Sequence, residues 1–253
     1  MVSNRPTVYD GARAMLLLVF AIGQLAAGFL PDALGWDVSI ASRSAEFNTA
    51  LIPAGYAFVI WLPLFFGNIA FAVFHALPGQ IQNPLYRRVG WFAAAAFAAN
   101  TFRSLYEPIN GPDWISFLLL VAILLPLLAA AVTITRSPAK PPLLATFPIY
   151  GQAGWITVAT AAGFSQMALF EGWNPFDLTA TIAAFGVVAA WTPLAITAAW
   201  AVRSFLFAAA MSWGLFWIGM ANVDTRGDIL TEAAWSLAVL TIIVTGASKL
   251  YAR

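Results

Sequence analysis

Few residues in this chain have the types and spacing that a catalytic or metal-binding site requires. Asp224 and Asp228 form an Asp-x-x-x-Asp pair, a spacing that holds magnesium and a diphosphate in membrane prenyltransferases, although a polar turn whose acids begin a helix explains it more simply. His75 is the only histidine and could ligate the metal of a haem or chlorophyll, but its place at the end of an apolar stretch favours an interfacial or capping role. Arg103 and Glu107 lie four residues apart, so they can pair across one helical turn.

Eight apolar stretches must position these residues. They cover residues 13–30, 55–77, 87–103, 114–135, 143–168, 178–200, 203–221 and 230–250. Most are close to the ~20 residues that cross a bilayer as a helix. The composition, with 61% hydrophobic and 9% charged residues, lies far from the roughly 25% charged residues of soluble proteins. We therefore expect an all-α, polytopic transmembrane helical bundle of about eight spans that forms a single integral membrane domain over residues 1–253, with a tight turn at Arg203-Ser204.

The basic residues divide unevenly between the two ends of the expected bundle. One end holds Arg5, Arg13, Arg87, Arg88, Arg136, Lys140, Arg203, Lys249 and Arg253. The other end holds Arg43, Arg103 and Arg226. Because basic loops stay in the cytoplasm, this pattern predicts that both termini are cytoplasmic and that the number of spans is even. The net charge of +1 gives no reason to expect nucleic acid as a partner, and the absence of cysteine excludes thiolate metal sites and disulfides.

A long connection and deeply placed aromatic residues point to a binding site. The segment from Pro31 to Ala54, which carries Trp36, is the longest connection between apolar stretches, and long connections in compact proteins are often functional. Five tryptophans lie well inside the apolar stretches: Trp61, Trp155, Trp191, Trp213 and Trp217. Flat side chains gathered inside a helical bundle can line a slot for a flat apolar ligand.

Two segments carry a resemblance to a known family. Residues 52–66 read IPAGYAFVIWLPLFF, and residues 148–160 read PIYGQAGWITVAT, a proline-aromatic start that leads to Trp-x-x-x-Ala. They resemble the second and fifth helices of the tryptophan-rich sensory protein/translocator protein (TspO/MBR) family. By this resemblance, residues 13–170 correspond to the family's five-helix core, and residues 178–250 add three transmembrane helices, as in longer bacterial relatives. The implied location is the bacterial cytoplasmic membrane.

The resemblance implies a pocket beneath the first long loop. Its ligand would be a tetrapyrrole such as a porphyrin or haem, or a sterol-like molecule, bound by a non-enzymatic receptor or carrier with a sensing or transport role. Trp36 would belong to a lid, while Asn100 and Arg103 would form one wall, with Arg103 meeting an anionic group at the rim. The other walls would be formed by Pro53, Tyr56, Phe58, Trp61, Phe65, Tyr150, Trp155 and Thr160.

Two other classes of function remain open from the sequence. The chain could be a structural or assembly subunit of a pigment-containing membrane complex, with its aromatic surface packed on pigments, lipid or partner helices. It could also be an integral-membrane enzyme acting on a lipid or isoprenoid, with Asp224 and Asp228 as metal ligands. The expected partners are the lipid bilayer and an apolar small molecule, with a homodimer or a membrane complex as further possibilities.

Overall fold

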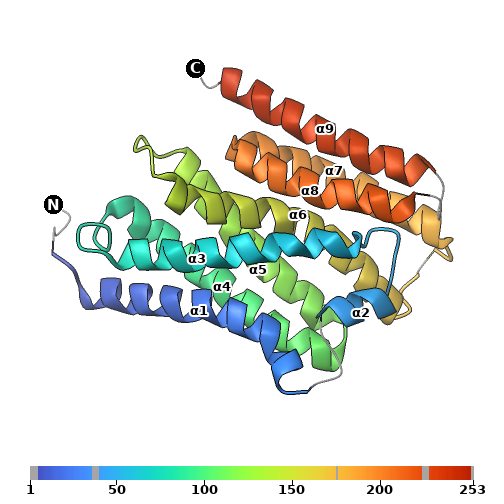
Figure 1. Cartoon of the computed structure of the whole chain (residues 1–253). Coiled ribbons are helices and arrows are strands. Elements are labelled where there is room, and N and C mark those ends of the chain that lie inside the picture. Colours follow the sequence, from blue (N-terminus) through green and yellow to red (C-terminus); the bar gives the residue numbers. More distant parts are fainter. Residues whose placement is uncertain (1–4, 36–39, 175, 224–227, 252–253) are drawn as a thin grey trace.

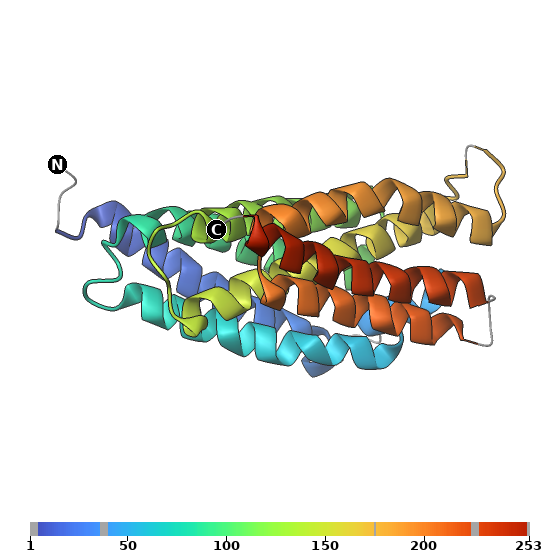
Figure 2. The same cartoon turned by 90° about the horizontal axis from the view of Figure 1, so that it is seen from above.

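The computed structural model describes residues 5–35, 40–174, 176–223 and 228–251, and in these ranges the regular structure is helical, without a strand. The long helices of these ranges, eight in number, lie side by side (Figures 1 and 2). They are α1 (Val8–Ala33), α3 (Trp61–Ala76), α4 (Pro84–Asn110), α5 (Trp114–Thr135), α6 (Leu143–Phe170), α7 (Ala180–Val202), α8 (Phe205–Asn222) and α9 (Asp228–Leu250). A short helix, α2 (Ile40–Glu46), and a 3-10 helix, η1 (Gly55–Ile60), lie between α1 and α3.

The helices have the length and composition of a membrane bundle. Among the described residues, seven helical segments are long and apolar enough to cross a bilayer, with η1 and α3 together forming one of them. α4 has 27 residues and is less apolar, but it packs between α1 and α5. Successive long helices alternate in direction, so the first turn of α1 and the last turn of α9 lie at the same end (Figure 1). The predicted polytopic helical bundle is confirmed.

Local sequence sets several helix ends. The side chain of Asp113 caps α5 by accepting from the Ser116 backbone N–H at 2.9 Å, as short polar side chains do at helix N-termini. The predicted tight turn between α7 and α8 is confirmed, because α7 ends at Val202 and Ser204 caps α8. Arg203 between them adopts the left-handed conformation, with φ of 51°, which reverses the chain within two residues.

α4 extends beyond the apolar stretch that predicted it. The predicted stretch, residues 87–103, was ended at the charged residue Arg103, whereas α4 continues to Asn110. The structure shows why: the Arg103 guanidinium pairs with the Glu107 carboxylate, which also accepts from the Ser116 hydroxyl. The two opposite charges neutralise each other one turn apart, as their spacing predicted. The helix then ends at Gly111, whose φ of 86° suits glycine.

α6 is the central helix of the bundle and has the largest buried share among the candidate spans. α8 approaches it very closely at Gly154, where a side-chain Cβ would lie 2.2 Å from the carbonyl oxygen of Phe207. Small residues allow such close backbone contact between membrane helices. α9 packs on α8, and α7 packs on α9 and α6, so the three C-terminal helices join the rest of the bundle largely through α6.

Four buried amides connect helices in the interior. Gln24 Oε1 on α1 accepts from Asn100 Nδ2 on α4 and from Gln152 Nε2 on α6, both at 2.9 Å. Asn68 Nδ2 on α3 donates to Gln152 Oε1 at 2.8 Å. A buried polar group in hydrocarbon must find a partner within the protein, so these bonds set how α1, α3, α4 and α6 are rotated against one another.

Candidate functional site

A cavity of about 440 Å³ lies among α1, η1, α3, α4 and α6. It is at the end of the bundle opposite the first turn of α1, where α2 lies (Figure 1). Its lining comprises Ala27, Gly28, Phe29, Pro31, Ser44, Ile52, Pro53, Gly55, Phe58, Val59, Trp61, Leu62, Phe65, Asn100, Arg103, Ser104, Leu120, Trp155, Val158, Ala159, Ala162 and Gln166. The volume lies within the ~300–1,000 Å³ range of small-molecule sites.

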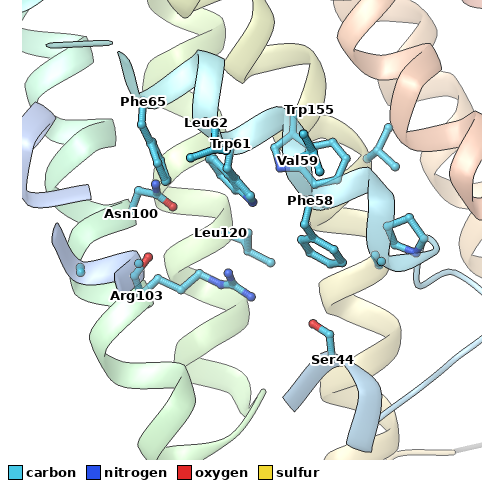
Figure 3. A pocket seen from close by; sticks show the side chains of 18 of the residues that line it. Ser44, Phe58, Val59, Trp61, Leu62, Phe65, Asn100, Arg103, Leu120 and Trp155 are labelled. Carbon is cyan, nitrogen blue, oxygen red and sulfur yellow. The ribbon is translucent and has the colours of Figure 1, made fainter. Parts of the chain in front are cut away.

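Aromatic rings form one side of the cavity. Trp61 and Phe65 are stacked on α3 with ring centroids 4.9 Å apart. Trp155 of α6 meets Trp61 and Phe58 edge to face, in both cases at 6.0 Å. Figure 3 shows these rings on the same side of the cavity. Rings held in such contacts cannot easily reorient, so they present a preformed apolar surface.

Polar side chains of α4 form the facing side. Asn100, Arg103 and Ser104 lie three and four residues apart, which places them on one face of the helix, and all three line the cavity. Figure 3 shows Asn100 and Arg103 across from the aromatic rings. Ser44 of α2 and Gln166 of α6 add polar groups to the lining. The cavity therefore combines an aromatic wall with a polar wall.

Two buried donors in the lining lack partners. Arg103 Nε and Trp155 Nε1 have no hydrogen-bond partner among the described residues, although Arg103 is only 8% exposed and Trp155 2%. An unpaired buried donor costs roughly 1–3 kcal/mol. Both atoms are shielded by neighbouring atoms, so an acceptor on a bound molecule would reach them only after a small rotation of the side chain.

The connection from α1 to α3 covers this end of the cavity. Arg43 Nε on α2 donates to the Pro108 carbonyl oxygen at 3.0 Å, which ties α2 to the end of α4. The Thr49 and Ser165 hydroxyls are hydrogen-bonded at 2.6 Å. These contacts tie the part of the connection that the structure describes after residue 39 to α4 and α6.

The structure brings most of the expected site residues together. Seven of them line the cavity: Pro53, Phe58, Trp61, Phe65, Asn100, Arg103 and Trp155. Trp36, the expected lid residue, lies outside the described residues, as does Asp224 of the acidic pair. The segment that was expected to form the lid does contribute Ser44 to the lining.

Three expected wall residues lie elsewhere, and the expectation is corrected for them. Tyr56 is 73% exposed and stacks on Trp217 of α8 at 5.7 Å. Tyr150 lies one and a half turns before Trp155 on α6, and its hydroxyl is hydrogen-bonded to Thr135 at 3.0 Å. Thr160 is buried, and its hydroxyl donates to the carbonyl oxygen of the preceding turn. Each residue lies in one of the two segments that resemble the family, but the rotation of its helix directs the side chain away from the cavity.

Several lining residues escaped the sequence analysis. Ser104 follows Asn100 by four residues, so helical spacing could have found it. Gln166 follows Trp155 by eleven residues on α6, about three helical turns, so helical spacing also points to it. Ser44 and Leu120 lie on α2 and α5, and no local pattern joins these two to the motifs. Only the packing of α2, α5 and α6 around the cavity brings them together.

His75 lies in the last turn of α3, near the end of the bundle, as expected, but its side chain is enclosed by the protein. Its side chain is fully buried, and Arg13 Nε donates to its Nε2 at 3.1 Å. The Tyr86 carbonyl oxygen lies 3.0 Å from the same nitrogen. Arg13 in turn pairs with Asp10 at 2.8 Å, and Asp10 with Arg87 at 2.7 Å. The histidine belongs to a buried ionic cluster at the opposite end of the bundle from the cavity.

Comparison with known proteins supports the resemblance. A search of curated proteins and a search of solved structures both give no match. The sequence profile of one family, described as TSPO-like protein, matches residues 14–247. The match covers the helices around the cavity and almost all of the three C-terminal helices, and the apolar helices that carry it mark an integral membrane protein. The chain belongs to the TSPO-like protein family.

Proposed function

We propose that this membrane protein is a receptor or carrier for a flat, largely apolar ligand with a polar edge, which binds in the cavity beneath α2. Tetrapyrroles such as porphyrins are the leading class of ligand, and sterol-like molecules are the second. The observation that carries the proposal is the facing arrangement of aromatic rings on α3 and α6 and polar side chains on α4.

The two walls suit the two parts of such a molecule. A flat ring system gains dispersion and stacking energy against Trp61, Phe65 and Trp155. A carboxylate at its edge would accept from the guanidinium of Arg103, whose side chain lines the cavity, in a charge-assisted hydrogen bond. Because Glu107 already neutralises Arg103, the site also accepts a neutral hydroxyl or carbonyl, which keeps sterol-like ligands in the proposal.

The lining also bears on how a tetrapyrrole would be held. Among the residues that line the cavity there is no histidine, methionine or tyrosine, the side chains that commonly ligate haem iron. The only histidine belongs to the ionic cluster at the other end. A tetrapyrrole would therefore be held by its faces and its acidic edge, and a metal-free porphyrin should bind as well as haem.

We further propose that the cavity lies near the outer surface of a bacterial cytoplasmic membrane, with both termini in the cytoplasm. The end of the bundle opposite the cavity carries Arg13, Arg87, Arg136, Arg203 and Lys249, and basic residues favour the cytoplasmic side. In this orientation, the protein would sense or transport a ligand that reaches it from the outer leaflet.

The test is titration of protoporphyrin IX into the protein in lipid nanodiscs, followed by quenching of tryptophan fluorescence. Phe65→Leu should weaken binding about threefold to tenfold, because one aromatic contact is lost. Phe66→Leu is the matched control, since Phe66 is the next residue but is 60% exposed on the outside, compared with 7% for Phe65.

A second variant tests the polar wall. Arg103→Gln should weaken porphyrin binding by about tenfold or more, the cost of one hydrogen bond to a charged group, but should change cholesterol binding much less. Absence of quenching in the wild type would refute the tetrapyrrole proposal. Equal effects of Phe65→Leu and Phe66→Leu would refute the location of the site.

A further inference from the structure

The segment from Ala50 to Phe58 is both a wall of the cavity and the link from the α2 region to α3. Ile52, Pro53, Gly55 and Phe58 line the cavity. A ligand in the cavity therefore contacts this segment. A displacement of the segment would change the shape of the site.

α8 holds it through three hydrogen bonds on consecutive helical turns. Asn222 Nδ2 donates to the Ala50 carbonyl oxygen at 2.8 Å. The Ala54 N–H donates to the Trp217 carbonyl oxygen at 3.1 Å. Trp213 Nε1 donates to the Ala57 carbonyl oxygen at 2.9 Å.

The three contacts follow one another along both α8 and the segment. Positions 217 and 213 are four residues apart and lie within about 40° of each other around α8 at 3.6 residues per turn, whereas Asn222 reaches the segment from the last residue of the helix. Their partners ascend from 50 to 54 to 57 while the α8 positions descend, so the segment runs antiparallel to α8. Tyr56 adds a stacked contact on Trp217, with 23° between the ring planes.

We propose that α8 is a clamp that holds residues 50–58 and thereby sets the rate at which ligand enters and leaves the cavity. The proposal rests on the function proposed above. Trp213 and Asn222 are positioning residues, since they do not line the cavity and act on it through the backbone of the segment.

The first measurement requires no ligand. Hydrogen exchange by mass spectrometry in nanodiscs follows the backbone amides of Ala54 and Ala57, which the segment's hydrogen bonds protect. Trp213→Phe keeps an aromatic ring but removes the donor, so exchange in residues 50–58 should become about threefold to tenfold faster, as expected for the loss of one net hydrogen bond. Asn222→Ala should act in the same direction.

The chain offers a matched control. Trp235 on α9 is 38% exposed, like Trp213, and its Nε1 also donates to a backbone carbonyl, that of Phe216, at 3.2 Å. Trp235→Phe therefore removes an equivalent bond that does not involve the segment, and it should leave exchange in residues 50–58 unchanged.

The second measurement is the dissociation rate of protoporphyrin IX by stopped flow. Trp213→Phe should accelerate dissociation by a factor similar to that for exchange, and Trp235→Phe should not. Unchanged exchange in both Trp213→Phe and Asn222→Ala would refute the clamp. Faster exchange with unchanged dissociation would refute its control of ligand passage. Faster exchange in a protein that binds no porphyrin would refute the proposed ligand and leave the clamp supported.

Discussion

The contact between α6 and α8 at Gly154 allows a prediction whose size follows from the structure. A Cβ at this position would lie 2.2 Å from the Phe207 carbonyl oxygen and 3.2 Å from the Met211 backbone nitrogen. Unstrained contacts require about 3.5 Å, and a backbone atom cannot swing aside as a side chain can. Gly154→Ala must therefore push α8 away from α6 by roughly 1 Å, and overpacking of this kind costs about 1–3 kcal/mol.

The direction of the stability change in Gly154→Ala is informative, because alanine forms helices better than glycine where space is free. Replacing glycine by alanine inside a helix stabilises it by about 1 kcal/mol where space is free. Gly186 on α7 provides that comparison, since a Cβ there would meet no atom within 4 Å. We expect Gly186→Ala to raise stability and Gly154→Ala to lower it.

Unfolding by SDS in mixed micelles, followed by circular dichroism, measures both variants against the wild type. Stabilisation by Gly154→Ala comparable to that by Gly186→Ala would refute the close packing of α6 and α8. The same variant tests the clamp indirectly, because a displaced α8 should also accelerate hydrogen exchange in residues 50–58.

Two further predictions concern buried polar groups. Gln24→Leu removes the acceptor shared by Asn100 and Gln152, so it should lower the free energy of unfolding by about 1–3 kcal/mol; an unchanged SDS midpoint would contradict the amide cluster. Arg103→Met leaves the buried Glu107 unpaired and should cost about 3–5 kcal/mol, whereas adding Glu107→Leu should recover most of the loss. Failure of the double variant to recover stability in the same assay would show that the two charges are not a pair.

The fold was largely predictable because membrane insertion depends on local composition. Apolar stretches located all eight long helices, and the helix from Trp114 to Thr135 begins and ends where its stretch does. The turn at Arg203-Ser204 followed from a length argument, since one helix through that region would be twice as long as the bilayer is thick. The predicted end of α4 was wrong, because the apolar stretch was ended at Arg103, although its four-residue spacing to Glu107 lets the two charges pair and the helix continue.

The site was predictable only in part, because helix rotation is not encoded locally in a membrane protein. In water, an apolar stripe marks the buried face of a helix, but in lipid both the inner and the outer face are apolar. The two segments therefore contain both Phe58 and Trp155, which line the cavity, and Tyr56 and Tyr150, which do not.

By itself, the sequence determined that this chain is a membrane-embedded helical bundle, where its long helices lie along the chain, and which family it resembles. Tertiary structure alone decided which side chains face the cavity, that His75 is buried in an ionic cluster, and that α8 holds residues 50–58. The physical reason is the range of the interactions. Helix formation and insertion depend on neighbours within a few turns, whereas the hydrogen bond from Trp213 to Ala57 joins residues 156 positions apart.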